Sequence, residues 1–256
     1  LQSPQGGTVF RYLAKRPPDT PLTANSVCCL YPLKTPAGED VVEFAPADHP
    51  HHRGVFMTWH TIDGQTPADF WGWGEFAPTQ DRVITNRSLK VLAAEADRAQ
   101  LEVRNDWVAA GTTLIEETTT ISARQEEGLH VIDLDFQLLP LCDLTLRQSA
   151  FGGLCVKSRK DGTGVYTSPE GVVTRPAPHH LQPESDWPAA AWYDYSITRA
   201  AGKTIGVTVI DHPENPPAAW HNLDVIAMVN PCIVAPGPVP LKAGQPLRLR
   251  YRLLAH

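Results

Sequence analysis

TTLIEETTTISA (residues 112–123) and LHVIDLDFQL (residues 129–138) are the two runs that decide the fold of this chain. Apolar and polar side chains alternate along both runs, and isoleucine, leucine, valine and threonine are frequent, which is typical of strands with one buried face. The Glu127-Gly128 turn signal between the runs predicts that the two strands pair antiparallel.

The same alternation recurs along much of the chain. It is present at residues 83–91, 100–107, 204–211 and 246–255, and turn signals separate the runs at Asp106, Gly111, Asp161-Gly162 and Ala243-Gly244. With 24 prolines and 18 glycines, the pattern predicts an all-β fold, a large antiparallel β-sandwich, and not a helical bundle or an alternating α/β sheet.

The 256 residues, 42% of them hydrophobic, can bury a sizeable core, and we expect one domain over residues 1–256. The proline-rich residues 171–188 are interpreted as a long loop over the sandwich surface. A net charge of −6 and the lack of a basic run argue against nucleic-acid or anionic-membrane partners. The longest apolar stretch, residues 225–241, contains Asn230 and four prolines and cannot cross a bilayer, so a soluble protein is predicted.

The five cysteines are interpreted mainly as buried thiols, because Cys28 and Cys29 are adjacent and a bond between them would be strained. Because the chain begins at Leu1, an exported protein is weakly favoured, and a cytoplasmic location stays an open alternative. No feature of the sequence indicates the oligomeric state.

A candidate site lies in DHPHHRGVFMTWHTIDGQTPADFWGWGE, residues 48–75, which holds four of the ten histidines and three of the seven tryptophans. Imidazole and guanidinium groups cost free energy to bury unless they are paired, so this density indicates function. His51, His52 and Arg53 are expected to cluster where a loop enters a strand. On a straight strand His60 would lie about 27 Å from His52, at roughly 3.4 Å per residue.

A second polar cluster begins at Asp211-His212-Pro213, which repeats the tripeptide at residues 48–50. Each tripeptide is followed by a Trp-His pair, Trp59-His60 in the first case and Trp220-His221 in the second. We therefore expect the two loops to form two walls of one pocket. The alternative is that Asp and Pro build turns and that each histidine bonds within its own loop.

Several motifs also point to a known family. They are His49-Pro50-His51-His52-Arg53-Gly54, Phe70-Trp71, Asp194-Tyr195-Ser196, the run 202–207, the loop 211–216, and residues 240–244 before the final strand. Over about residues 40–256 the chain resembles the bacterial PmoA-like family. The family label refers to a membrane-bound methane oxygenase, an activity not expected of a chain without a bilayer-spanning segment.

The resemblance implies a sandwich similar to galactose mutarotase and a small-molecule partner that is a sugar or glycoside. Flat tryptophan rings stack on the apolar face of a pyranose, and polar side chains bond its hydroxyl groups. The expected substrate-binding residues are His49, Arg53, His60, Trp71, Gln148, His212, Asn215 and Trp220.

Imidazoles on opposite sides of a sugar can give and take protons near neutral pH. We expect His51 or His52 as one catalytic partner and His221 as the other, with Asp211 or Glu75 fixing a tautomer or acting as a carboxylate base. Ring opening of an aldose (mutarotase type), epimerisation beside a carbonyl, β-elimination from a keto-glycoside and hydrolysis all fit, and the residues do not choose among them.

Two other interpretations stay open. A divalent metal could be held by His49, His51 and His221, although no helical His-x-x-x-His spacing is present. The same aromatic and polar groups could also form a non-catalytic carbohydrate-binding protein. No phosphate-binding glycine loop, dinucleotide fingerprint or Gly-x-Ser-x-Gly elbow occurs in the sequence, so no nucleotide cofactor is expected.

Overall fold

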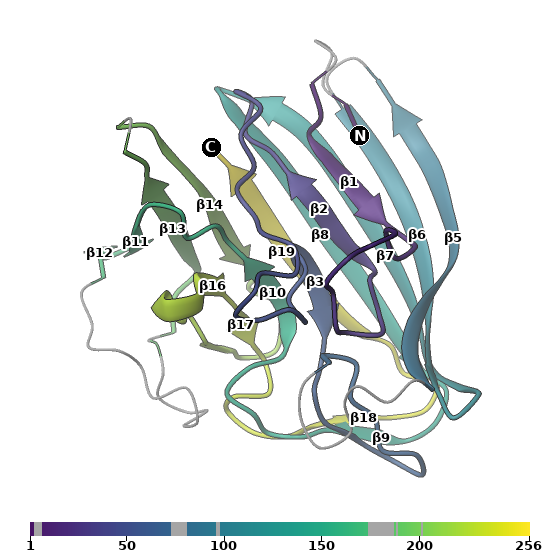
Figure 1. Ribbon diagram of the computed structural model, residues 1–256. Helices are drawn as coiled ribbons and strands as arrows, with labels where there is room; N and C mark the ends of the chain where they lie inside the picture. The colour runs from purple at the N-terminus through teal and green to yellow at the C-terminus, as the bar shows by residue number, and fades with distance from the viewer. Residues whose placement is uncertain (3–6, 73–80, 96–97, 174–186, 188, 201) are drawn as a thin grey trace.

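A computed structural model describes residues 1–2, 7–72, 81–95, 98–173, 187, 189–200 and 202–256. Two antiparallel sheets face each other (Figure 1). The larger sheet has the strand order β12-β11-β13-β14-β19-β8-β7-β6-β5. Its strands are β5 (Arg82–Ala94), β6 (Arg98–Ala109), β7 (Thr112–Glu126), β8 (Leu129–Pro140), β11 (Thr163–Ser168), β12 (Gly171–Val172), β13 (Trp192–Thr198), β14 (Thr204–Asp211) and β19 (Leu247–Ala255).

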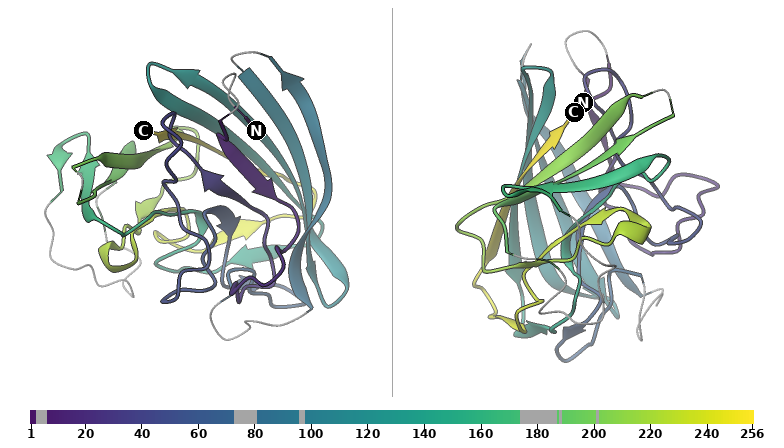
Figure 2. Two further views of the ribbon diagram at one scale, coloured as in Figure 1. Left: turned by 45° about the horizontal axis from the view of Figure 1, so that its top comes forward. Right: turned by 90° about the vertical axis from the view of Figure 1, so that its left-hand side faces the viewer.

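The smaller sheet lies across one face of the larger sheet (Figure 2). Its strand order is β1-β2-β3-β10-β16. These strands are β1 (Phe10–Leu13), β2 (Cys29–Leu33), β3 (Val55–Thr58), β10 (Gly153–Lys157) and β16 (Met228–Val229). Short pairings complete the described structure. β9 (Leu144–Leu146) lies between β4 (Ile62–Asp63) and β18 (Val239–Leu241) and pairs with both. β15 (Ala219–Trp220) pairs with β17 (Pro231–Cys232), and η1 (Asp224–Ile226) is a single 3-10 turn.

The predicted antiparallel β-sandwich is confirmed. The two runs that indicated it form the β7–β8 hairpin, in which Glu126 pairs with Leu129. Glu127 and Gly128 both adopt positive φ, of 43° and 81°, as a tight two-residue hairpin turn requires. The other alternating runs fall in β5, β6, β14 and β19.

Strand alternation divides the apolar side chains of the smaller sheet between its two faces. Val55 and Met57 on β3 belong to the core between the sheets. Phe56 points to the opposite face and joins a second apolar cluster with Cys155 and Trp71. The smaller sheet therefore carries apolar groups on its outer face as well, and the candidate site is built there.

All five cysteines are free, as expected of buried or half-buried thiols. In the part of the chain that the structure describes, no helix has the length and apolar character to cross a membrane. Most of the predicted long loop at residues 171–188 lies outside the described residues; β12 and Trp187 are described within it.

Candidate functional site

A pocket of about 280 Å³ opens on the outer face of the smaller sheet. We call it the histidine pocket. Four imidazoles from two segments that are far apart in the sequence line it, together with two aromatic rings and several aliphatic side chains. The lining residues are His49, His51, His52, Trp71, Phe151, His221, Leu223, Val225, Ile226 and Met228.

The first wall is a turn that gathers three imidazoles. The His52 N–H donates to the His49 carbonyl at 2.9 Å, which folds residues 49–52 back on themselves. The His49 and His52 rings stack with centroids 5.1 Å apart, and the His51 ring meets the His52 ring edge-on at 4.4 Å. An extended backbone would have sent His51 and His52 to opposite faces; the turn brings them together.

Burial controls the charge of these imidazoles. It lowers the pKa of His51 to about 4 and holds the pKa of His52 well below its ordinary value, and the neighbouring histidines act in the same direction. Both rings are therefore neutral near pH 7, where a neutral imidazole offers one donor and one acceptor nitrogen.

The second wall comes from the end of β15. The His221 N–H donates to the Asn230 carbonyl at 2.8 Å, and the His221 ring lies 5.7 Å from the Phe151 ring. Phe151 also packs against Trp71 at 5.1 Å. The two aromatic rings thus connect the walls that carry the histidines.

His60 lies close to this site instead of far along a strand. Strand β3 ends at Thr58, and the His60 ring packs 4.8 Å from the Phe151 ring. Burial lowers the pKa of His60 to about 4. His60 does not line the pocket itself but supports Phe151, which does.

Arg53, predicted to bind substrate, does not line the histidine pocket. The side chain is 1% exposed, and its guanidinium donates to the carbonyl oxygens of His51, Trp71 and Phe70 at 3.0, 3.3 and 3.3 Å. It also lies 4.4 Å above the Phe56 ring. Arg53 is a scaffold residue that joins the histidine turn to the Trp71 loop.

The tryptophans divide between the pocket and the core. Trp71 lines the pocket and meets the His52 ring edge-on at 5.7 Å. Trp220, expected to stack on a sugar, does not line the pocket: it is buried between the sheets, donates from Nε1 to the Ala190 carbonyl at 3.0 Å, and packs on Tyr193. Trp59 is likewise a core residue against Trp107.

The second Asp-His-Pro loop, at residues 211–213, does not line the histidine pocket. The expectation that the two Asp-His-Pro loops form two walls of one pocket is therefore wrong. It follows β14, a strand of the larger sheet, and Asp211 and His212 line a separate hollow with outward-facing residues of that sheet such as Asp133 and Arg252. Asn215 locks the loop by donating to Asp211 at 2.6 Å and to the Arg250 carbonyl at 2.8 Å. Only His221, further along the chain, reaches the pocket.

Of the remaining expected residues, Gln148 is described and does not line the pocket. Gln148 donates from Nε2 to the Ala235 carbonyl at 3.0 Å and is absent from the pocket wall. Glu75 lies outside the described residues, as does Trp73. Within the described ranges no group of three or more His, Cys, Asp or Glu side chains is arranged to hold a metal ion, so the metal set His49, His51 and His221 is not assembled.

Part of the pocket lining has no recognisable sequence signal. Leu223, Ile226 and Met228 lie in and beside η1, in a stretch without clear periodicity. Phe151 precedes Gly152, which has a φ of +142°. A Cβ atom at Gly152 would lie 2.6 Å from the Trp59 ring, so the Gly152-Gly153 pair is a sign of close packing beside Phe151.

Asp69, which no sequence motif marks, organises the Trp71 loop. Its Oδ1 accepts a hydrogen bond from the Gly72 N–H at 2.9 Å, and the side chain is nearly fully buried. Burial raises the pKa of this carboxyl to about 7. The wall that presents Trp71 therefore rests on a carboxyl group that titrates near neutrality.

A family model described as "Family of unknown function (DUF6807)" matches residues 3–256. The chain belongs to DUF6807. That description does not contain the PmoA-like label, and no curated protein matches this DUF6807 chain.

Solved structures similar to the DUF6807 chain include two sugar-related proteins. A GH36 α-galactosidase, AgaA A355E D478A from Geobacillus stearothermophilus in complex with stachyose, is 11% identical with a TM-score of 0.45, and the match covers 76% of this chain and 29% of that one. A galactose mutarotase related enzyme from Lactobacillus acidophilus is 8% identical with a TM-score of 0.36, covering 66% and 71%.

Proposed function

We propose that the protein is a carbohydrate-active enzyme that uses histidine acid/base chemistry on a sugar or keto-sugar glycoside in the histidine pocket. One observation carries the proposal: the imidazoles of His51 and His52 and that of His221, 169 positions beyond His52, line the same small pocket. Burying several imidazoles in one place costs free energy, and a role in catalysis or binding accounts for that cost.

The lining suits a sugar ring. Phe151, Ile226 and Met228 offer an apolar surface to the C–H face of a pyranose, and the ring of Trp71 extends that surface. The neutral imidazoles can bond hydroxyl groups as donor and as acceptor. A volume of about 280 Å³ lies near the lower end of ligand pockets, roughly 300–1,000 Å³, which fits one sugar unit.

The proposed proton transfer uses both walls. His51 or His52, neutral near pH 7 because it is buried, accepts a proton, and His221 on the opposite wall acts as its partner. Asp211 lines the separate hollow on the larger sheet, so the proposed proton transfer does not use it. This pair would serve ring opening, epimerisation beside a carbonyl, or β-elimination from a keto-glycoside.

A non-catalytic sugar-binding protein is the second candidate. The observation that favours it is the burial of the imidazoles: a pKa of about 4 makes His51 a weak base, and a weak base transfers protons less efficiently at neutral pH. In that case the histidines would serve as hydrogen-bond partners only.

The test is a product screen by NMR with free aldoses and 3-keto-glycosides, since anomer exchange, elimination and hydrolysis give different products. His51→Asn, His52→Asn and His221→Asn are then compared for sugar binding and turnover. His212→Asn, in the other Asp-His-Pro loop, is the matched control and should behave as the parent. Unchanged turnover in all three pocket variants would refute the catalytic role, and binding without turnover in the parent would establish the second candidate.

A further inference from the structure

A second hollow, of about 500 Å³, lies beside the histidine pocket. We call it the outer hollow. Aromatic and charged side chains share its wall, a mixture that the proposed function does not use. The residues that matter here are Tyr31, Glu43, Phe44, Asp48, Arg159 and Lys160.

A narrow ridge joins the two hollows. Asp48 lines the outer hollow and the next residue, His49, lines the histidine pocket. Lys160 Nζ bonds the Asp48 carboxylate and also donates to the Val225 carbonyl at 3.5 Å. Val225 belongs to the rim of the histidine pocket and is 66% exposed. Asp48 and Lys160 thus stand between the walls of the two hollows, and we call them the ridge.

The outer hollow has an aromatic floor. The rings of Tyr31, on β2, and Phe44 lie with centroids 5.1 Å apart and their planes inclined by only 31°. Both side chains are half-buried, so each keeps part of its ring accessible. The two rings pack against each other at a tilt, and the accessible part of either ring offers a flat apolar surface on which the C–H face of a pyranose can stack.

Buried and networked partners fix the polar groups of this hollow. Glu43 Oε2 accepts a hydrogen bond at 2.9 Å from Lys157 Nζ, and the Lys157 side chain is 0% exposed. A carboxylate anchored in this way is preorganised to accept hydrogen bonds from ligand hydroxyl groups.

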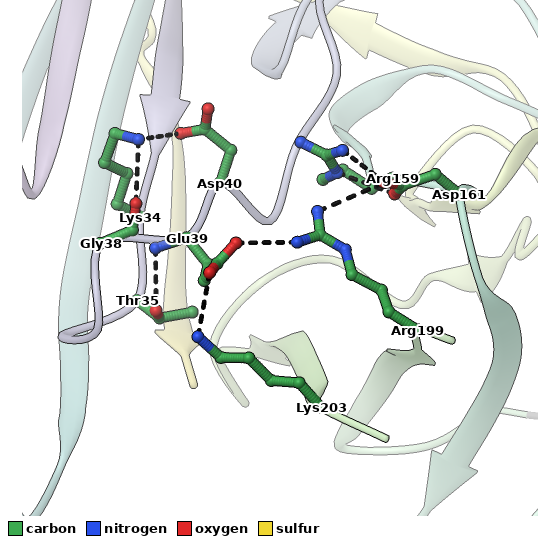
Figure 3. Close-up of polar contacts among 9 residues, drawn as sticks. All are labelled: Lys34, Thr35, Gly38, Glu39, Asp40, Arg159, Asp161, Arg199 and Lys203. Carbon is green, nitrogen blue, oxygen red and sulfur yellow. Dashed lines mark hydrogen bonds and ion pairs between the residues drawn. The ribbon is translucent and has the colours of Figure 1, made fainter. Parts of the chain in front are cut away.

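Arg159 is held by an ion-pair cluster (Figure 3). Its Nε and Nη2 donate to the two Asp161 carboxylate oxygens at 2.8 and 2.5 Å. Asp161 also pairs with Arg199 at 3.3 Å, and Arg199 pairs with Glu39 at 2.8 Å. The cluster connects residues 34–40, the turn after β10 and the β13–β14 turn, so Asp161, which holds the Arg159 guanidinium, is itself held by Arg199 and through it by Glu39.

We infer that the outer hollow is a second sugar subsite and that the substrate is a disaccharide or longer glycoside spanning both hollows. The inference rests on the proposed function, because the first sugar unit occupies the histidine pocket. The second unit stacks on Tyr31 and Phe44, and its hydroxyl groups bond Glu43 and Arg159. The ridge of Asp48 and Lys160 lies under the linkage between the two units.

The experiment measures affinity against chain length by calorimetry. The probes are methyl glucoside and methyl galactoside beside maltose, cellobiose, lactose and melibiose. At least one disaccharide should bind about tenfold more tightly than the matching methyl glycoside, the gain expected from one additional stacked and hydrogen-bonded ring. Phe44→Leu keeps an apolar side chain but removes the flat ring, and it should abolish most of this gain while leaving the monosaccharide affinity unchanged.

The variants separate this inference from the proposed function. Tyr31→Ser tests the same floor if Phe44→Leu does not fold, and Leu141→Ala, an exposed position outside both hollows, is the control. His221→Asn should weaken monosaccharide and disaccharide alike. Monosaccharide binding with no gain for any disaccharide, or a gain untouched by the floor variants, overturns the second subsite alone. No binding by any of these sugars, together with no binding or turnover of the free aldoses and 3-keto-glycosides of the product screen, overturns the proposed function and this inference together.

Discussion

Arg53 donates a hydrogen bond from Nη1 to the carbonyl oxygen of Trp71 at 3.3 Å, across 18 positions of sequence. The same Nη1 donates to the His51 carbonyl at 3.0 Å. One buried guanidinium therefore sets the spacing between an imidazole and an indole that both line the histidine pocket. The residue that looked like a ligand for substrate is instead the support on which two pocket residues rest.

Replacing Arg53 with methionine should lower the free energy of unfolding by about 3 kcal/mol. Each buried carbonyl oxygen that loses its donor costs roughly 1–3 kcal/mol, and part of this loss is offset because the buried cation and its desolvation cost are removed. Urea unfolding followed by fluorescence measures the change. Arg147→Met, at an exposed pair with Asp63, is the control and should leave the transition where it is. A loss of sugar affinity at full stability would instead support direct ligand contact by Arg53.

His51 should make stability depend on pH below neutrality. The pKa of His51 is about 4 in the folded state, lower than in the unfolded chain. The contribution of neutral His51 to the free energy of unfolding is therefore complete above about pH 6.5 and is lost as the pH falls towards 4. His51→Asn should make the slope of unfolding free energy against pH shallower in this range, by up to about 1.4 kcal/mol per pH unit. His60→Asn, whose pKa is lowered to a similar value, should behave alike. Identical slopes in parent and variants would contradict the burial of neutral imidazoles.

Asp69 should act with the opposite sign. Its pKa is raised to about 7 in the folded state, so the folded protein binds the Asp69 proton more tightly than the unfolded chain does. The contribution of Asp69 to the free energy of unfolding is therefore complete below about pH 4 and is lost as the pH rises to 7. Asp69→Asn keeps an oxygen to accept the Gly72 N–H and cannot ionise. The stability of the parent relative to the variant should therefore fall between pH 4 and 7, measured by urea unfolding at several pH values. A difference that stays constant, or rises with pH, would show that Asp69 is ionised throughout.

Trp71 and Trp220 should separate binding from stability. Trp71→Phe shortens the aromatic wall of the pocket, and sugar affinity should fall about three- to tenfold in an NMR or calorimetric titration. Trp220→Phe removes a core ring and its hydrogen bond to Ala190, and it should lower the free energy of unfolding by about 1–3 kcal/mol with sugar affinity retained. The reverse assignment of the two effects would place Trp220 in the site.

The strands could be predicted because their signal is local. In β7 and β8 each residue faces the core or the outside according to its place in a period of two, and Glu127-Gly128 supplies the turn at its own position. The density of histidines at residues 49–52 likewise predicts a candidate site from sequence alone, because the free-energy cost of burying an imidazole is a property of histidine itself.

The membership of the site could not be predicted in the same way. Two Asp-His-Pro tripeptides read alike, yet Asp48-His49-Pro50 leads into β3 of the smaller sheet and Asp211-His212-Pro213 follows β14 of the larger one. Their surroundings therefore lie on different sheets. The sequence likewise did not distinguish Trp71, on a pocket wall, from Trp220, between the sheets.

By itself the sequence determined the alternating strands, the hairpin turns and the concentration of imidazoles, because each depends on a residue and its near neighbours. The tertiary structure alone decided that His221 meets His51 and His52, that Arg53 faces carbonyl oxygens, and that Phe151 and Met228 complete the wall. Those contacts join segments of different strands, and they form only when the sheets pack, which no local pattern records.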